Sequence, residues 1–325
     1  MITSRNGILL TNTGTPNEPN ARALWRYLKE FLLDKRIVQM PQWLWQPLLY
    51  SVVLPRRAFY SANLYRKIWT EHGSPMRHWM EKIRETLQQN LQQDNFEIAL
   101  GMHYGTPSIK QGLEELRRKK VDRLIVLPLF PQYSLTTTAS SFDKVTAALQ
   151  HWPLIPQLHF VHHYADHPAY IKAYSQHIKL ARQAPHLLFS FHGIPQLYVD
   201  RGDTYPQFCQ ITAAAIAKEL QLAPNSWSIS YQSRFGYSRW LKPYTNEVLQ
   251  ELAQRGVTEV DVVCPGFSVD CLETLEEIAI RAKEQFLLAG GKSFRYIPAL
   301  NNKDEHIQTL NEIIYSTLSV ICSRQ

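Results

Sequence analysis

The sequence predicts an α/β protein whose parallel sheets carry helices on both faces. Short apolar runs of strand length alternate with amphipathic helical segments along the chain. This alternation starts twice, with about four strands in each half, and Pro153, Pro156 and Pro168 cluster between the halves. The chain has 325 residues, 45% of them hydrophobic, which is enough for two domains that each bury a core.

The first half begins with a short buried strand, and its other elements follow in regular order. The expected strands are Gly7–Thr11, Phe96–Met102, Arg123–Leu127 and Leu158–Val161, and the expected helices are Ala21–Leu33, Pro75–Gln93 and Ile109–Lys120. The last of these helices ends in the basic run Arg117–Lys120, where positive charges suit the helix dipole. The run is therefore explained by the helix and does not by itself indicate an anionic partner.

A hydroxyl-rich loop, Ser134–Ser141, precedes a further helix in this half. Such a loop can bind a phosphate through its backbone and hydroxyl donors. It can equally cap the helix that follows, which is the commoner outcome.

The segment Arg36–Tyr65 differs from the rest of the chain. It is dense in large apolar side chains, it is interrupted by three prolines, and it carries Arg56 and Arg57 in its middle. The sequence supports two interpretations equally. One is an insertion that packs on the core, and the other is an exposed apolar lip that rests on a membrane or covers an apolar ligand.

The second half repeats the alternation of strands and helices. Its expected strands are Leu187–Phe191, Trp227–Tyr231, Val260–Cys264 and Phe294–Ile297, and its expected helices are Pro168–Arg182, Tyr205–Leu220, Tyr244–Arg255, Leu272–Leu288 and a closing helix from about Lys303. The two halves share this pattern without sequence repetition, so each is expected to form its own sheet.

Composition excludes several classes of protein. The balance of 35 Lys and Arg against 28 Asp and Glu gives a net charge of +7, but the positive residues are spread along the chain and no nucleic-acid motif accompanies them. The four cysteines show no CxxC pairing, and the N-terminus has no secretory signal, so a cytosolic protein is expected. No run approaches the roughly 20 apolar residues of a membrane span.

His192 is the first candidate for chemistry. It ends the apolar run Leu187–Phe191, and Gly193 and Pro195 follow at once as turn residues. An imidazole at the carboxyl end of a core strand lies on the rim where open α/β sheets bind ligands. For a lone histidine, a satisfied side chain at a strand end is the commoner outcome, so a second site residue is needed.

Glu273 supplies that second residue. Strand Val260–Cys264 ends in the turn Pro265-Gly266, Ser268 or Asp270 is expected to cap the next helix, and Glu273 and Glu277 share one face of it. Acids in a first helical turn also favour the dipole, which explains Glu276 and Glu277 without any function. If both strands are central, His192 and Glu273 meet at one edge, where they can bind a divalent metal or move protons.

Ten motifs in this order and spacing resemble those of the ferrochelatases, which insert Fe2+ into protoporphyrin IX to make protohaem. The motifs are LLTNTGTP (9–16), YLKEFLLDKRIV (27–38), GSPM (73–76), HYGTPSI (103–109), LPLFPQYSLTTTASS (127–141), SFHGIP (190–195), DRGDTYP (200–206), YQSRFG (231–236), WLKPYT (240–245) and CPGFSVDCLETLEEI (264–278). The resemblance spans nearly the whole chain. It implies two Rossmann-like, chelatase-type domains, each with a mainly four-stranded parallel sheet flanked by helices.

The resemblance also implies a role for individual residues. His192 and Glu273 match the catalytic and iron-binding pair, and Glu277 would relay protons outward. The positions that line the porphyrin cleft are matched by Thr13, His103, Tyr104, Tyr133, Trp240 and Phe267. The expected domains are 1–157, with the apolar lip at 36–65, then 158–302, and a closing helix at 303–325 that returns to the first domain.

The chain departs from the pattern at several positions. His103 stands where some relatives have arginine, Cys271 where some have histidine, and Arg281 where some carry an acid. The C-terminal segment holds no cluster of cysteines, and Cys322 alone cannot hold the iron–sulfur centre of some relatives, so no such centre and no other permanent cofactor is expected. Fe2+ is then a substrate.

The expected setting is the cytoplasm, with peripheral contact with the inner membrane, as a monomer or homodimer. Three alternatives stay open at this stage. They are a porphyrin or haem carrier without catalysis, a chelatase for another tetrapyrrole or metal, and a coproporphyrin enzyme.

Overall fold

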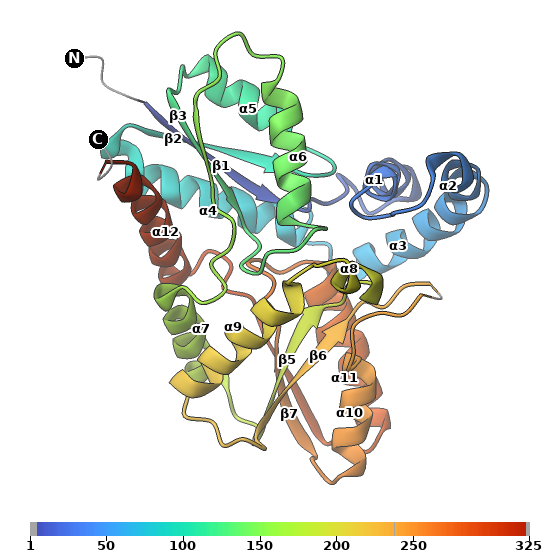
Figure 1. Ribbon diagram of the computed structural model, residues 1–325. Helices are drawn as coiled ribbons and strands as arrows, with labels where there is room; N and C mark the ends of the chain where they lie inside the picture. The colour runs from blue at the N-terminus through green and yellow to red at the C-terminus, as the bar shows by residue number, and fades with distance from the viewer. Residues whose placement is uncertain (1–4, 237, 323–325) are drawn as a thin grey trace. The chain divides into compact units, whose positions relative to one another are not determined.

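The computed structural model describes residues 5–236 and 238–322. These residues contain two four-stranded sheets, and every strand pair within each sheet is parallel. The predicted α/β class with two such sheets is therefore confirmed (Figure 1). The chain divides into two compact units. The first takes residues up to 129, 135–162 and from 310 onward, and the second takes 130–134 and 163–309.

The first unit holds the sheet with strand order β2-β1-β3-β4. Its strands are β1 (Asn6–Asn12), β2 (Phe96–Met102), β3 (Arg123–Pro128) and β4 (Gln157–Phe160), and its helices outside the lip are α1 (Ala21–Leu33), α4 (Pro75–Leu91), the 3-10 turn η2 (Gln92–Asp94), α5 (Ile109–Arg118) and α6 (Thr138–Leu149). Leu9 and Val126 of the sheet pack against Leu113 of α5 and Val145 of α6 in one core cluster. Full burial of such side chains contributes about 1.5–3 kcal/mol each, so this core fixes the sheet.

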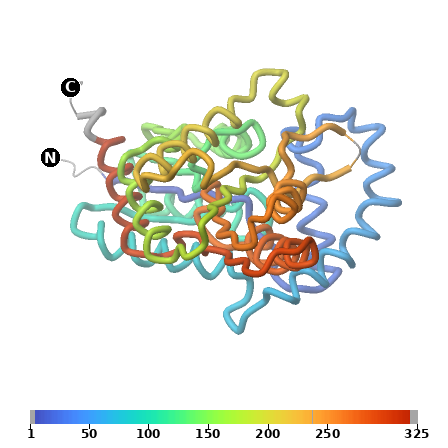
Figure 2. Tube along the Cα trace, turned by 90° about the horizontal axis from the view of Figure 1, so that it is seen from below, coloured from blue at the N-terminus to red at the C-terminus, as the bar shows by residue number. Residues whose placement is uncertain are grey.

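The segment 36–65 forms helices α2 (Gln42–Leu48), the π-helical turn η1 (Leu49–Val53) and the start of α3 (Leu54–Ile68). In Figure 2 this segment is the blue helical run on the right. Trp45, Leu49 and Leu54 pack against α1 in a core cluster. Trp43 and Phe59, by contrast, are 75% and 69% exposed. The segment therefore packs on the core with one face and exposes large apolar side chains on the other.

The second unit holds the sheet with strand order β6-β5-β7-β8. Its strands are β5 (His186–His192), β6 (Trp227–Gln232), β7 (Glu259–Val263) and β8 (Ser293–Ile297), and its helices are α7 (Pro168–Ala181), α8 (Gln196–Asp200), α9 (Tyr205–Glu219), α10 (Thr245–Gln254), the π-helix η3 (Glu273–Ala282) and α11 (Lys283–Leu288). Helix α12 (Asp304–Cys322) closes the described chain. Leu188 and Val262 of the sheet pack against Leu249, Ile278 and Phe286.

The strand orders create a topological switch point in each sheet. In the second sheet the chain passes from β5 to β6 on one side and then crosses to β7 on the other side of β5. The loops that leave the carboxyl ends of β5 and β7 therefore diverge, and open α/β sheets bind ligands at such points. His192 ends β5, and the segment that carries Phe267 and Glu273 follows β7.

The expected helix Leu272–Leu288 is confirmed, as a π-helix over Glu273–Ala282 that continues as α11. The expected cap of this helix is wrong. Neither Ser268 nor Asp270 caps it, since the helix starts after Leu272 without a side-chain cap. Instead the Asp270 carboxylate accepts hydrogen bonds from Thr274 and from Tyr296, at 3.0 and 2.6 Å. These hydrogen bonds occupy the Asp270 carboxylate, which therefore does not cap the helix.

The hydroxyl-rich loop does not supply the expected capping bond. Helix α6 begins at Thr138, and Thr137 makes no capping bond with its side chain. Ser140 donates to Asp34 at 2.8 Å, and Ser141 is hydrogen-bonded to Thr11 at 3.0 Å. These hydroxyls therefore join α6 to neighbouring segments of its own unit.

His306 is expected to make the stability of the folded protein fall at acid pH. Its ring is buried, Nδ1 donates to the carbonyl of Asn301, and Nε2 has no partner within the described residues. Burial lowers the pKa of His306 to about 4. Between pH 6.5 and 4 the unfolded chain thus binds a proton that the folded chain does not, so stability present above pH 6.5 is lost as the pH falls.

We expect His306→Gln to lose less stability than the wild-type protein between pH 7 and pH 4. The difference should be on the order of 3 kcal/mol, because the variant has no imidazole to protonate at this position. Chemical denaturation at both pH values measures it. His151→Gln, at an exposed histidine, is the control, and equal acid sensitivity in the wild type and His306→Gln would contradict the expectation.

Candidate active site

His192 lies at the carboxyl end of β5 with its ring half-buried. Nδ1 lies 2.6 Å from the carbonyl oxygen of Gly193. A carbonyl oxygen only accepts hydrogen bonds, so this contact assigns the hydrogen of the neutral ring to Nδ1. The lone pair of Nε2 is then the basic and metal-binding position of the imidazole.

Gly193 is required where it stands because the backbone comes close to β6. Its amide donates to the carbonyl of Gln232 at 2.8 Å. A Cβ at Gly193 would lie 2.8 Å from that carbonyl oxygen and 3.3 Å from the Trp240 ring, which is closer than real Cβ contacts to backbone. Glycine thus lets the chain turn directly after the imidazole.

Two aromatic side chains stand beside His192. The centroid of the Phe267 ring is 6.4 Å from that of His192, with 58° between the ring planes. The backbone of Trp240 forms an isolated antiparallel β-bridge with that of Pro195. The indole Nε1 of Trp240 is buried and has no hydrogen-bond partner within the described residues. A buried donor left unpaired is uncommon, and aromatic faces suit a flat apolar ligand.

Glu273 opens the π-helix η3 and is half-buried. Its main-chain carbonyl accepts a hydrogen bond of 2.8 Å from the side-chain amide of Gln232. Gln232 is also the residue that pairs with His192 in the parallel register of β5 and β6. The described structure therefore brings the imidazole and the start of the acidic helix to the same edge of the second sheet, as the sequence predicts.

The neighbouring acids of η3 take different partners. Glu277 accepts hydrogen bonds from the amide and the hydroxyl of Ser233, at 2.8 and 2.5 Å. Glu276 is buried and is paired with Arg281 at 2.7 Å. Arg281 is therefore engaged by the buried acid, whereas Glu273 and Glu277 are only half-buried.

Sequence reasoning missed two residues that organise this edge, Gln232 and Asp270. Gln232 ends β6 next to the His192 strand, and the side chain of Asp270 is bonded to Thr274, Tyr296 and Asn301 just ahead of Glu273. Their positions after strand ends were the available signal. That signal is weak, because a buried glutamine or aspartate has many structural uses.

Three other predicted site residues lie in the first unit, at the carboxyl ends of β1 and β2. The amide of Tyr104 donates to the carbonyl of Thr13, and that of His103 to the carbonyl of Asn12. Thr13 is half-buried, whereas His103 and Tyr104 are only 6% and 1% exposed. The structure thus brings Thr13, His103 and Tyr104 together, with little of the two rings at the surface.

A buried polar network surrounds these two rings. The Tyr104 hydroxyl donates to Asp34 at 2.8 Å, and Lys144 lies 3.3 Å from the same carboxylate. Burial alone would raise the pKa of Asp34, but these partners and the Arg36 amide lower it. Burial, reinforced by Lys144, lowers the pKa of His103 to about 3, so this imidazole is neutral.

Tyr133 belongs to the short segment 130–134 of the second unit and is half-buried. Its neighbour Gln132 donates to Thr212 at 2.9 Å, and Ser134 donates to Asp203 at 2.9 Å. These two bonds hold the segment that presents Tyr133.

The residues described hold no cluster of three or more His, Cys, Asp or Glu side chains arranged to bind a metal ion. Cys209, Cys264 and Cys271 are buried thiols, and the side chain of Cys322 lies outside the described residues.

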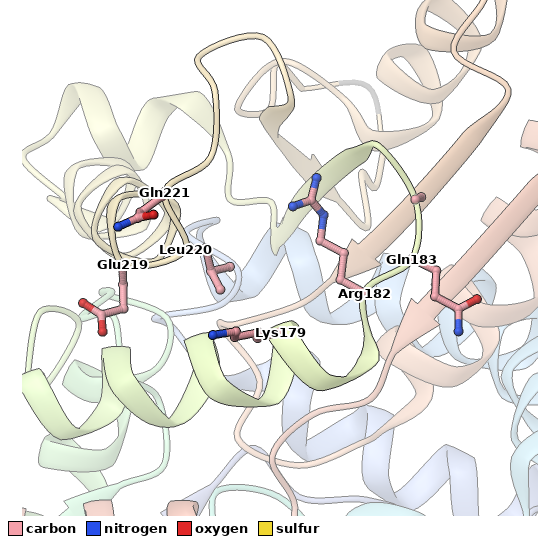
Figure 3. Close-up of a pocket in the computed structure, with 7 residues that line it drawn as sticks. Lys179, Arg182, Gln183, Glu219, Leu220 and Gln221 are labelled. Atoms are coloured by element: carbon pink, nitrogen blue, oxygen red, sulfur yellow. The ribbon is translucent and has the colours of Figure 1, made fainter.

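A cavity of about 610 Å³ elsewhere in the second unit is a separate feature. Figure 3 shows it lined by Lys179 and Arg182 at the end of α7 and by Glu219 and Gln221 at the end of α9. These residues precede the amino ends of β5 and β6, whereas His192 lies at the carboxyl end of β5. The cavity is therefore at the opposite edge of the sheet from the candidate site.

The fold is shared with solved chelatase structures. The structure titled "SirB from Bacillus subtilis with Fe3+" matches 96% of this chain and 95% of its own, with a TM-score of 0.55 and 12% identity. At that identity the likeness concerns the fold alone. No helix among the residues described is both long and apolar enough to cross a membrane.

Sequence comparison gives a closer relationship. A family model described as Ferrochelatase matches residues 5–318. The ferrochelatase of Photobacterium profundum is 47% identical over 312 residues, which are 95% of this chain and 96% of that protein. The ferrochelatase of Methylococcus capsulatus is 49% identical over 311 residues, covering 94% and 95% of the two chains. The chain therefore belongs to the ferrochelatase family, as its motifs predict.

Proposed function

We propose that this protein is an enzyme that inserts Fe2+ into protoporphyrin IX, giving protohaem and two protons, the last step of haem synthesis. The observation that carries the proposal is that His192, whose Nδ1 is bonded to the Gly193 carbonyl, and the start of the helix that Glu273 opens lie at one edge of the second sheet. Membership of the ferrochelatase family supports it.

The reaction requires a base, and His192 supplies one. Free porphyrin holds two N–H protons in the plane of its ring, and both must leave before Fe2+ occupies the four nitrogens. The Nε2 lone pair of His192 accepts a proton, while Nδ1 stays bonded to the Gly193 carbonyl. The ring keeps its orientation throughout because that bond persists in both protonation states.

Glu273 is proposed as the acid that holds the incoming Fe2+ and passes protons outward. Its carboxylate can bind the hydrated ferrous ion, and two protein ligands hold that ion less tightly than a closed site would. Glu277, one helical turn further on, is proposed to continue the proton path. Its two oxygens are hydrogen-bonded to the amide and the hydroxyl of Ser233, which orient the carboxylate.

Porphyrin binding is proposed for the six remaining predicted residues. Phe267 and Trp240 present aromatic surface beside His192, and Tyr133 and Thr13 are also partly exposed. His103 and Tyr104 are proposed for the same role, with most of each ring covered by its own unit. Aromatic contacts hold a bent macrocycle, and binding energy spent on that distortion lowers the insertion barrier.

The experiment that tests the proposal compares free porphyrins. Purified protein is supplied anaerobically with Fe2+ and either protoporphyrin IX or coproporphyrin, and the loss of free-porphyrin fluorescence gives the rate. We expect faster turnover of protoporphyrin. Faster turnover of coproporphyrin would change the assigned substrate, and binding without turnover of either would make the protein a carrier.

The remaining expectations stay proposals. We propose domains at 1–157 and 158–302, with a closing helix at 303–325 that returns to the first domain. We also propose that the protein has no permanent cofactor. It is proposed to be a monomer or homodimer in the cytoplasm. Peripheral attachment to the inner membrane is proposed through the lip. There Trp43 and Phe59 are exposed, Arg56 is an exposed cation, and an apolar groove of about 360 Å³ lies between Trp25 and Phe59 with Arg22 and Arg26 on its rim.

The double variant Trp43→Ser, Phe59→Ser is expected to bind anionic lipid vesicles at least about tenfold more weakly than the wild type. Each exposed aromatic ring is worth on the order of 1–2 kcal/mol when it enters a membrane interface. Co-sedimentation with phosphatidylglycerol vesicles measures it. Leu288→Ser, at an 88% exposed leucine of α11, is the matched control, and equal binding by all three proteins would exclude the lip.

A further inference from the structure

Gln232 connects three parts of the candidate site. Its main-chain carbonyl accepts the amide of Gly193, next to His192, at 2.8 Å. Its side-chain Nε2 donates to the main-chain carbonyl of Glu273, also at 2.8 Å. One residue therefore ties the turn after the imidazole to the first residue of the acidic π-helix.

The orientation of this amide is set by a chain of hydroxyls. Ser190 donates to Oε1 of Gln232 at 2.8 Å, and Ser190 is linked to Thr245 and Thr245 to Ser230, each at 2.9 Å. Because Oε1 accepts from Ser190, the NH2 group must face Glu273. Gln232 is 3% exposed, so water does not compete for these bonds.

Ser233 makes the next contact with the same helix. Its amide and hydroxyl both donate to the carboxylate of Glu277. Its backbone φ of +68° is a left-handed conformation that directs both donors to one side. The dipeptide Gln232–Ser233 thus contacts η3 at both acids that are proposed for proton transfer.

We infer that Gln232 and Ser233 are positioning residues for iron insertion, which set the backbone of Glu273 and the carboxylate of Glu277 relative to His192. The inference rests on the proposed function of those three residues. Gln232 bonds the carbonyl of Glu273 and not its carboxylate, so the charge stays available to substrate while its backbone is fixed. Ser233 bonds the carboxylate of Glu277 directly, which orients that acid.

Misplacing a catalytic group by about 1 Å costs on the order of 100-fold in rate. We therefore expect Gln232→Leu to lower kcat about 30-fold with KM for porphyrin changed less than threefold. In a Glu273→Gln background the same substitution should cost less than threefold, because the carboxylate that it positions is already gone. A loss of similar size in both backgrounds would overturn the inference.

Two further variants separate positioning from a general loss of stability. Ser233→Gly removes only the hydroxyl donor, since glycine keeps the amide and favours φ of +68°, and kcat should fall about fivefold. Ser228→Ala is the matched control. It removes the 2.9 Å bond to His186 at the other end of the same strand pair, and its kcat should equal that of the wild type.

Hydrogen–deuterium exchange of the full chain gives a readout that does not depend on turnover. We expect amides of residues 273–278 to exchange at least tenfold faster in Gln232→Leu than in wild type or Ser228→Ala. Unchanged exchange, or kcat within threefold of wild type, would overturn the inference. A wild-type protein that inserts no iron would overturn the proposed function, and the exchange experiment would still decide whether Gln232 fixes the helix.

Discussion

Replacing His192 with alanine is expected to lower the rate of Fe2+ insertion about 1,000-fold while porphyrin binding changes less than fivefold. The substitution removes the Nε2 lone pair that accepts the porphyrin proton, and loss of a positioned base typically costs 10²–10⁴-fold. A 1,000-fold loss corresponds to about 4 kcal/mol of transition-state stabilisation. Stopped-flow fluorescence measures binding and insertion in the same mixture.

His186→Gln is the matched control for this variant. It changes the histidine at the amino end of the same strand, where the ring is buried and bonded to Ser228. Its insertion rate should equal that of the wild type at the same folded fraction. An active His192→Ala protein would mean that another group removes the protons.

Glu273→Gln is expected to lower kcat about 100-fold and to leave porphyrin affinity within threefold. Glutamine keeps the size of the side chain and the main-chain bond to Gln232, so the helix stays in place. The negative charge that holds Fe2+ and accepts protons is lost. Steady-state rates at several Fe2+ concentrations should show the loss in kcat and in KM for iron.

Glu284→Gln, at an exposed acid of α11, is the control for the change in charge. Glu277→Gln should cost less than Glu273→Gln, about tenfold, because it stands one step further from the reacting atoms. An unchanged rate for Glu273→Gln would remove that residue from the site, even if His192 were confirmed.

The strands and most helices could be predicted because their signals are local. Leu187–Phe191 is a run of side chains that are all fully buried in β5, and a run of that length has few other uses. The basic end of α5 and the buried stripe of α1 are likewise visible in the sequence. His192 could be found because it follows such a strand directly.

The π-helix could not be predicted, because apolar spacing over ten residues does not distinguish it from an α-helix. Contacts around it come from distant parts of the chain. Gln232 reaches the Glu273 carbonyl from β6, and Tyr296 and Asn301 bond the Asp270 carboxylate just ahead of the helix. Partners this far apart in the chain leave no local pattern.

The hydroxyls of the Ser134–Ser141 loop failed as a signal for a related reason. Serine and threonine serve as caps, anion donors and internal bonds, and only the partner decides among these uses. Ser140 donates a hydrogen bond to Asp34, which lies more than 100 positions earlier in the chain. The sequence shows the donors without showing that acceptor.

The measurement that tests the central claim most directly is the anaerobic rate of Fe2+ insertion by the double variant His192→Ala, Glu273→Gln. If the imidazole and the carboxylate act in one step, the double variant should be no more than about fivefold slower than His192→Ala alone. A rate lower by the product of the two single losses, about 10⁵-fold below wild type, would show that they act independently and would contradict a single site.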